Sequence, residues 1–518
     1  MTATAVRTDS GGRGNPADDR GFFGHPRGLR TLFLVELWER FSYYGMRALL
    51  ILFMTAPIAA GGLGWSTDKA GPIYGMYTAM VYLMSVPGGW IADRLIGQRK
   101  AVFWGGVSIM IGHIVLAIPS VNTFYAGLLF VIIGTGLLKP NISTIVGQIY
   151  APDDERRDAG FSIFYMGINL GALIAPLVTA SLAQEQWFKN VLTSWGMNPV
   201  SSWHWGFGAT AVGMFLGLVW YVLDQRTLGD AGTRPVVSSD AEAARLRRMF
   251  WMGLGLVALI SVIVAVLQAS GVIALTVAKV NGLFSGVLFT IVIVFFVWLL
   301  FLSGGWTSEE KKRLIVIAVL FWGAAIFWSV FEQAGSTLSL FAERSTNNSI
   351  FGMSFGSGKW QSVNSAWVIA LAPVFAWLWV KLGHRDPSSP TKFALGLLFV
   401  ALGFAWMVPA AQLAANGNKV GWWWLMGCYF LHTVGEMCLS PVGLSAMTKL
   451  APPRVASLIM GVWFMATSVG NFLGGQVAGA YERFSLPTIF GAVAGVALAF
   501  ALLMALLINP IKRMLARP

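Results

Sequence analysis

The chain has 518 residues, of which 56% are hydrophobic and only 11% are charged. So little charge excludes a soluble protein of this size, and apolar runs of about twenty residues without alternation exclude an outer-membrane barrel. The net charge of +13 is assigned to the loops of a membrane protein, because no basic, aromatic-interleaved soluble domain is present to bind nucleic acid. The composition predicts an all-α polytopic membrane protein embedded in a lipid bilayer.

Apolar segments predict about fourteen membrane spans in a pattern of six, two and six. Residues 1–27 are polar and lack an apolar core, which predicts a cytoplasmic tail and not a cleaved signal peptide. Residues 28–223 form the first group, with spans near 28–56, 69–92, 101–119, 122–149, 157–183 and 204–223. Residues 224–311 form a cytoplasmic linker with two extra spans, near 248–270 and 278–303. Residues 312–518 form the last group, with spans near 312–341, 360–382, 392–412, 420–448, 454–480 and 486–510.

Lys and Arg gather in the loops on one side of these spans, as in 94–100, 245–248 and 311–313. The loops on the other side, near 57–68, 184–203, 343–359 and 413–419, are poorer in both. The positive-inside rule then places both termini in the cytoplasm. The two cysteines, Cys428 and Cys438, lie in one apolar segment and are expected to be free thiols.

The first span carries four charges, at Glu36, Glu39, Arg40 and Arg47. Each would cost roughly 2.5–3.5 kcal/mol at the bilayer centre if it faced lipid, so all four are expected to face protein or a water-filled cavity. Glu36, Arg40, Tyr43 and Arg47 follow one another by four, three and four residues, which places them on one helix face. The alternative is that Glu36 and Arg40 form an internal pair that only neutralises its own charges.

Charged residues also interrupt later apolar spans. Lys139 lies in the fourth span and needs an anionic partner, which Glu36 and Glu39 of the first span could supply; the alternative is that its amine reaches an interface. Glu332 is the acid in the middle of the seventh span, and it could pair with Arg47 in a bridge between the two halves that opens and closes. Glu436 is the acid of the tenth span.

Polar and aromatic residues accompany these charges. Asn169 opens the fifth span and can both donate and accept hydrogen bonds, which suits a polar ligand, although such residues often only join helices. Tyr44 and Tyr82 are expected to line the same cavity, or else to lie at a membrane interface. Asn364 in the eighth span and Trp463 in the eleventh are further candidates.

Several stretches resemble one family. Residues 36–47 read Glu-x-x-Glu-Arg-Phe-Ser-Tyr-Tyr-Gly-Met-Arg, and residues 161–173 contain Phe-Tyr-Met-Gly-Ile-Asn-Leu-Gly. Together with Lys139 and the Asp-Arg loop of residues 88–100, they resemble the proton-dependent oligopeptide transporters of the major facilitator superfamily. This resemblance implies two six-helix bundles with a helical hairpin between them, in a bacterial inner membrane. It also implies import of di- and tripeptides with protons by alternating access, by a protein expected to be monomeric.

The resemblance also implies roles. Glu436, helped by Asn169 and Asn364, would hold the amino terminus of the peptide, and Arg47 and Lys139 would meet its carboxyl terminus. The proton-coupling residues would be Glu36, Glu39, Arg40, Lys139 and Glu332. Animal members carry a histidine in the second helix where this chain has Gly75, and residues 69–92 contain no histidine, so proton transfer is expected to fall to carboxylates.

Other functions remain open from the residues. A proton-coupled nitrate or organic-anion symporter is the nearest alternative, but a mono-anion gives Glu436 nothing to bind. A membrane enzyme or a non-transporting sensor is the alternative from another class. The sequence contains no P-loop, zinc-ligand cluster or nucleophile elbow, so neither an enzyme nor a cofactor or metal is expected, with protons as the coupling ion.

Overall fold

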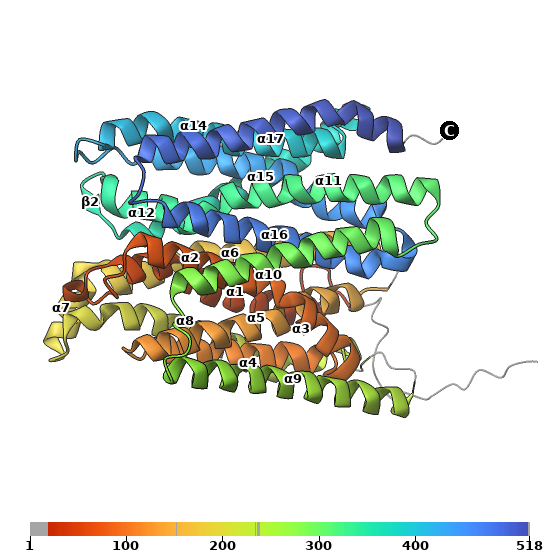
Figure 1. Ribbon diagram of the computed structural model, residues 1–518, viewed down its shortest axis with the longest axis horizontal. Helices are drawn as coiled ribbons and strands as arrows, with labels where there is room; N and C mark the ends of the chain where they lie inside the picture. The colour runs from red at the N-terminus through yellow and green to blue at the C-terminus, as the bar shows by residue number, and fades with distance from the viewer. Residues whose placement is uncertain (1–18, 152, 234, 236–238, 516–518) are drawn as a thin grey trace, which may run out of the picture.

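The structure is a computed structural model that describes residues 19–151, 153–233, 235 and 239–515. Residues 1–18 of the predicted tail therefore lie outside the described residues. The chain is mostly helical, and its long helices run side by side along the longest axis of the molecule (Figure 1). We call the end where α7, α12 and the strands lie the outer end, at the left of Figure 1, and the opposite end the inner end.

The first group of helices contains residues from Arg27 to Asp224. Its members are α1 (Arg27–Thr55), α2 (Thr67–Leu83), α3 (Ser85–Ile91), α4 (Gln98–Leu116), α5 (Val121–Gln148), α6 (Arg157–Gln184), α7 (Gln186–Ser194) and α8 (Ser202–Asp224). Helix α1 packs between α6 and α8, and most of its residues are buried. The four charged side chains in its interior, Glu36, Glu39, Arg40 and Arg47, are buried and therefore shielded from lipid, as the cost of exposing them there requires.

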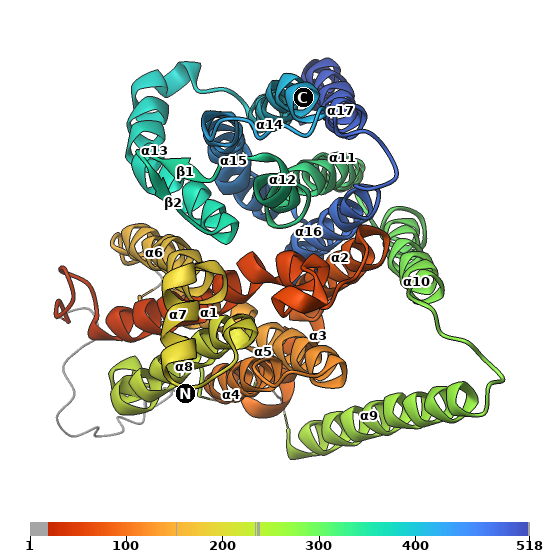
Figure 2. The same ribbon diagram turned by 90° about the vertical axis from the view of Figure 1, so that its left-hand side faces the viewer.

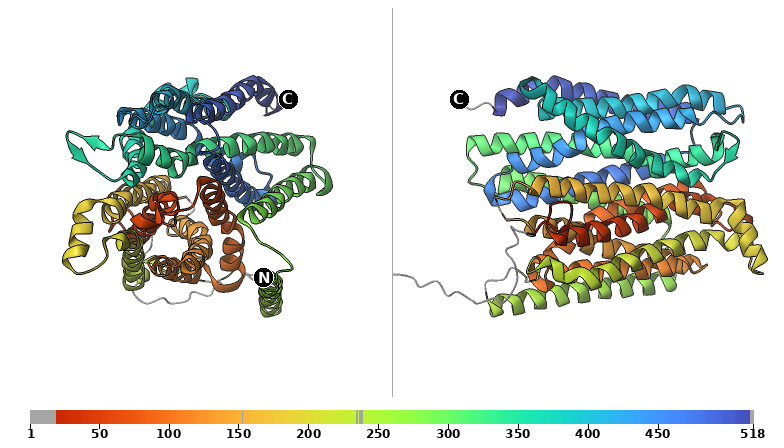
Figure 3. Two further views of the ribbon diagram at one scale, coloured as in Figure 1. Left: turned by 60° about the vertical axis from the view of Figure 1, so that its left-hand side comes forward. Right: turned by 180° about the vertical axis from the view of Figure 1, so that it is seen from behind.

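Two helices follow outside the first group, α9 (Asp240–Ala269) and α10 (Val277–Val297). Helix α10 packs against α2 and α16. Helix α9 lies apart at the edge of the molecule (Figures 2 and 3), and none of its residues, all of which are described, is buried. A helix that is apolar and unburied all round is suited to contact with lipid.

The second group contains α11 (Ser308–Phe331), α12 (Thr337–Ser345), α13 (Gln361–Leu382), α14 (Ser389–Ala414), α15 (Trp423–Leu450), α16 (Ala456–Gly479) and α17 (Leu486–Leu515). A short antiparallel hairpin of β1 (Ser349–Ile350) and β2 (Met353–Ser354) precedes α13. The two groups form two separate bundles in both views of Figure 3. The predicted division of the chain at residues 28, 224 and 312 stays a prediction; the nearest helix ends are Arg27, Asp224 and Ser308.

Within the described residues, ten helical stretches are long and apolar enough to cross a bilayer. Helices α1, α2, α15 and α16 are not among the ten, but they pack beside them in the two bundles. The architecture is thus two helical bundles with two further helices between them in sequence, as predicted. Cys428 and Cys438 are both free and buried, which confirms the prediction of free thiols.

The bundles meet along two helix pairs, α2 with α16 and α6 with α13. At the first pair Gly75 faces Gly475 so closely that a Cβ on Gly75 would lie 2.9 Å from the Cα of Gly475. Small residues allow such close backbone approach in membranes. The same contact explains why Gly75 could not carry an imidazole without separating the bundles.

A break in the chain at the end of α11 positions part of the site. Helix α11 begins with a capping box, in which Glu310 N donates to Thr307 Oγ1 at 3.2 Å and Thr307 N to Glu310 Oε2 at 2.9 Å. It ends at Phe331, and the tighter turn η7 (Glu332–Gly335) leads into α12. Glu332 therefore sits at a helix break, and it projects toward the first bundle.

Candidate functional site

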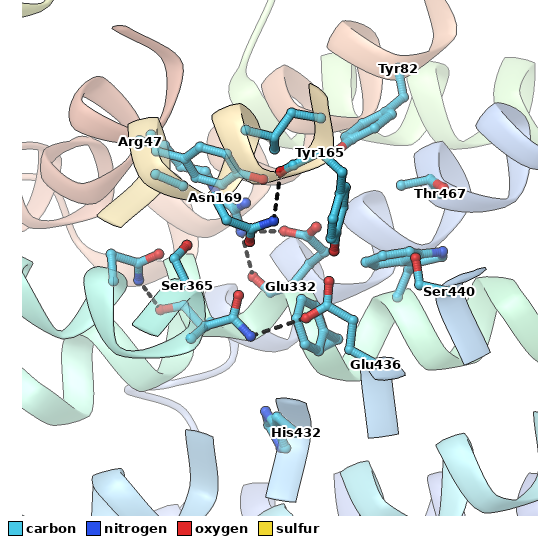
Figure 4. Close-up of a pocket in the computed structure, with 18 of the residues that line it drawn as sticks. Arg47, Tyr82, Tyr165, Asn169, Glu332, Ser365, His432, Glu436, Ser440 and Thr467 are labelled. Atoms are coloured by element: carbon cyan, nitrogen blue, oxygen red, sulfur yellow. Dashed lines mark hydrogen bonds and ion pairs between the residues drawn. The ribbon is translucent and has the colours of Figure 1, made fainter. Parts of the chain in front are cut away.

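A cavity of about 250 Å³ lies between the two bundles. It is lined from the first bundle by α1, α2, α5 and α6, and from the second by α11, η7, α13, α15 and α16. The predicted site residues that line it are Tyr44, Arg47, Tyr82, Lys139, Asn169, Glu332, Asn364, Glu436 and Trp463. Residues that are far apart in sequence are therefore brought to one place (Figure 4).

Glu36, Glu39 and Arg40 form a buried cluster inside the first bundle, and they are not among the described residues that line the cavity. Arg40 Nε lies 3.2 Å from Glu36 Oε1 and also pairs with Glu39 Oε2. The three side chains are 4%, 0% and 3% exposed, respectively. One oxygen of each acid and one Arg40 nitrogen lack a hydrogen-bond partner in the described structure. Two acids against one cation leave this cluster short of one positive charge, or of one proton.

Lys139 differs from the prediction. Its Nζ lies 3.8 Å from the centre of the Tyr82 ring, in a cation–π contact, and Lys139 forms no ion pair among the described residues. The expected direct pair with Glu36 or Glu39 is absent from the described structure, in which Arg40 of the same helix pairs with both acids. Lys139 and Tyr82 both line the cavity.

Arg47 joins the two bundles. Its guanidinium pairs with Glu332 Oε2 and donates to the Glu332 carbonyl oxygen at 3.3 Å. Its Nε also donates to Tyr74 Oη at 2.7 Å. A Cβ on Gly335 would lie 2.7 Å from Arg47 Nε, so glycine is needed there for the close approach. The predicted contact between Arg47 and Glu332 is present; its role as a gate stays a prediction.

Glu436 lies in the second bundle and is only 9% exposed. Asn364 Nδ2 donates to Glu436 Oε2 at 3.1 Å and to Thr433 Oγ1 at 2.9 Å. Asn169 donates to the Tyr165 carbonyl oxygen one turn earlier, at 3.0 Å. In Figure 4, Glu332 lies between Arg47 and Glu436. The cavity thus has cations, Arg47 and Lys139, on the side of the first bundle and acids, Glu332 and Glu436, on the opposite side.

The sequence reasoning missed several residues at this site. Tyr74 holds Arg47, and Gln361 donates to the Ala334 carbonyl oxygen and to Ser339 Oγ. Tyr165 lines the cavity one helical turn before Asn169. Its place in the motif of residues 161–173 was a usable signal. Tyr74 carries no such signal, whereas Gln361 lies three residues before the candidate Asn364 in a polar stretch, and that nearness was a usable signal too.

The outer end carries further contacts between the bundles. Lys359 Nζ lies 2.5 Å from Glu185 Oε1, and the backbone nitrogen of Gly358 donates to Gln184 Oε1 at 2.9 Å. On the other side of the molecule, Thr67 N donates to Glu482 Oε2 at 3.2 Å, and Arg344 pairs with the same acid at 2.8 Å. The Arg344–Glu482 pair lies within the second bundle, whereas the other three contacts, together with the Arg47–Glu332 pair, join the two bundles.

Comparison with known proteins places these features in context. The profile described as "PTR2: POT family" matches residues 99–493. The chain is 38% identical to the peptide transporter YePEPT of Yersinia enterocolitica, over 97% of each chain. It is 35% identical to a di-/tripeptide transporter of Lactococcus lactis, over 93% of this chain and 96% of that one. The crystal structure of a peptide transporter POT in complex with sulfate superposes with a TM-score of 0.87 at 42% identity, over 96% of this chain and 97% of that chain.

Proposed function

The chain belongs to the POT family, and we propose that it is a proton-coupled symporter that imports di- and tripeptides by alternating access. The observation that carries this proposal is the polarity of the cavity. Arg47 and Lys139 border it from the first bundle, and Glu436 borders it from the second. A zwitterionic peptide presents opposite charges at its two ends, and it suits a site with opposite charges on its two walls.

We assign the peptide carboxylate to Lys139 and Arg47. Lys139 is the more available of the two, since it contacts the Tyr82 ring whereas Arg47 is paired with Glu332. The peptide amine would bind Glu436, whose carboxylate is oriented by Asn364. Asn169 can pair with the peptide amide. Tyr44, Tyr82 and Trp463 supply the aromatic walls of the cavity.

The coupling proposal follows from charge balance. Arg40 alone cannot neutralise both Glu36 and Glu39. The further cation that we assign to this balance is Lys139, which lines the cavity. A peptide carboxylate that binds Lys139 competes for that charge, and a proton on Glu36 or Glu39 restores the balance. Each ligand then favours the other, and by linkage the effect is reciprocal.

Alternating access would use the Arg47–Glu332 pair. This pair and the outer-end contacts of Lys359 and Glu482 support assignment of the structure to a form closed at the outer end. Glu332 also borders the cavity. A change in its protonation or pairing would therefore change the charge at the wall where the peptide is proposed to bind. The protein is proposed to work as a monomer in a bacterial inner membrane, with its termini in the cytoplasm.

An uptake assay tests the proposal. Proteoliposomes with an alkaline interior should accumulate labelled dialanine above its external concentration, and a protonophore should collapse the accumulation. Accumulation of labelled nitrate but not of dialanine would instead support the anion alternative, against which the buried Glu436 argues. Dialanine that only equilibrates, with or without the pH gradient, would contradict proton coupling.

A further inference from the structure

A second, larger cavity of about 1000 Å³ lies toward the inner end, between α6, α13 and α15 and beside the start of α14. Most of its lining is apolar, and Met166, Ile369, Ala372 and Phe375 are among the residues that form its walls. It touches the central cavity through Tyr165 and Asn169, which line both. Apart from Asn169, none of the residues assigned above to peptide, proton or gate lines this cavity.

The cavity exists because the inner half of α13 stands away from its neighbours. The buried residues of α13, a helix described throughout, are Ser362, Ser365 and Val368, so none follows Val368. Figure 2 shows α13 at the margin of the second bundle. Met166 is 50% exposed and Ile369 is 38% exposed, so the cavity is open at the side. At this depth in a membrane, the surrounding medium is acyl chain and not water.

The inner rim of this cavity is cationic. Lys392 is 8% exposed, its Nζ lies 2.8 Å from Asp386 Oδ2, and it also stacks on the Trp379 ring at 4.1 Å. Lys449, at the end of α15, is exposed at the same rim. Two lysines against one aspartate leave a positive rim at the end that the positive-inside rule assigns to the cytoplasm.

We propose that this cavity is a binding site for an anionic phospholipid of the cytoplasmic leaflet. One acyl chain fills the space between α6, α13 and α15, and the phosphate lies at the rim beside Lys449 and Lys392. Apolar walls at membrane depth accept the chain, and the rim selects the charge of the headgroup. The chain would end near Tyr165 and Asn169, so the lipid would hold α13 away from α6 beside the peptide site.

Photo-labelling of the full-length protein tests this site. The protein is placed in nanodiscs of phosphatidylcholine. Each sample contains a trace of one photoactivatable lipid with a diazirine in its acyl chain, either phosphatidylglycerol or phosphatidylcholine. After illumination, the labelled peptides of the protein are mapped by mass spectrometry. Label should concentrate on residues 161–169, 368–379 and 437–446. Since a basic residue near the surface contributes about 1 kcal/mol toward an anionic lipid, phosphatidylglycerol should label these segments roughly fivefold more than phosphatidylcholine.

Variants separate the site from ordinary lipid contact. Ala372→Trp should fill the cavity and remove most of the label, and Ala376→Phe is a second filling variant should the first not reach the membrane. Val380→Trp is the matched control, because Val380 is 83% exposed and does not line the cavity. Lys449→Gln should leave the label in place but remove much of the preference for phosphatidylglycerol. Label as strong on α9 as on α13, equal labelling by the two lipids, or label unchanged in both filling variants would overturn the proposal, whether or not peptide transport is observed.

Discussion

Helix α1 carries two ion clusters about two turns apart, and they differ in what they connect. Glu36, Glu39 and Arg40 lie within one bundle, with two acids for one cation. Arg47 meets a single acid, Glu332, in the other bundle. The first cluster can gain or lose a proton without parting the bundles, whereas the second cannot separate without parting them. This difference suits the first to proton coupling and the second to gating.

The largest effect is expected where the charge imbalance is removed. Glu36→Gln or Glu39→Gln should abolish peptide accumulation driven by a pH gradient, because the cluster no longer needs the proton. Exchange of peptide across a membrane with equal pH should continue, since it moves no net proton. Both are measured in proteoliposomes, with Glu309→Gln, an exposed acid outside the site, as the control. Wild-type accumulation in both glutamine variants would move the coupling site elsewhere, with Glu332 next to be tested.

In the proposed coupling, Lys139 links the first cluster to the peptide in the cavity. Lys139→Ala should abolish driven uptake as well, because the carboxylates and the peptide no longer compete for one cation. Lys139→Arg keeps the charge, so it should retain part of the driven uptake although its shape differs. Equal activity of the alanine and arginine variants would show that the charge of Lys139 is not used.

The second cluster is tested by breaking and restoring its pair. Glu332→Gln leaves Arg47 buried without its counter-ion, and loss of one partner of a buried pair costs about 3–5 kcal/mol, or on the order of a hundredfold or more in an equilibrium. The outer end should therefore open more often, and a cysteine at Gln361 in the cavity wall should react faster with a membrane-impermeant reagent. The swap Arg47→Glu with Glu332→Arg should recover slow labelling. Unchanged labelling in Glu332→Gln would reject the gate.

Glu436 lies opposite the cations, and its loss should be selective. Glu436→Gln should weaken uptake of peptides with a free amine by roughly thirtyfold, the equivalent of about 2 kcal/mol for a buried charge that loses its partner. N-blocked peptides should be affected much less. Competition assays with the two substrate classes measure the ratio, and equal losses for both would reject the assignment of the amine to Glu436.

The smallest effect is expected at the outer end. Lys359 and Glu185 are 23% and 17% exposed, and partly exposed pairs contribute about 1 kcal/mol at most. Lys359→Met should therefore change the labelling rate of the same Gln361 cysteine by no more than about fivefold. An effect as large as that of Glu332→Gln would mean that the outer contacts, and not the Arg47–Glu332 pair, keep this end closed.

The sequence by itself determined the class of the protein and most of its central residues. Long apolar runs can only be membrane helices, and a charge inside such a run must be turned toward protein or water. That reasoning selected Glu36, Arg47, Lys139, Glu332 and Glu436 before any contact was known. Helical spacing also placed Glu36 and Arg40 on one face of the first span, and the structure pairs these two residues, the contact that the sequence analysis gave as the alternative.

Only the tertiary structure decided which charges meet across helices. Helical spacing defines directions around one axis, but the distance between two axes depends on packing, as at Gly75 and Gly475. Spacing within one helix therefore could not predict that the Lys139 amine would contact the Tyr82 ring instead of pairing with a glutamate. Nor could it predict the hydrogen bond from Arg47 to Tyr74. The cavity beside α13 was hidden for the same reason, because an apolar helix has the same sequence pattern whether it packs against its neighbours or stands away from them.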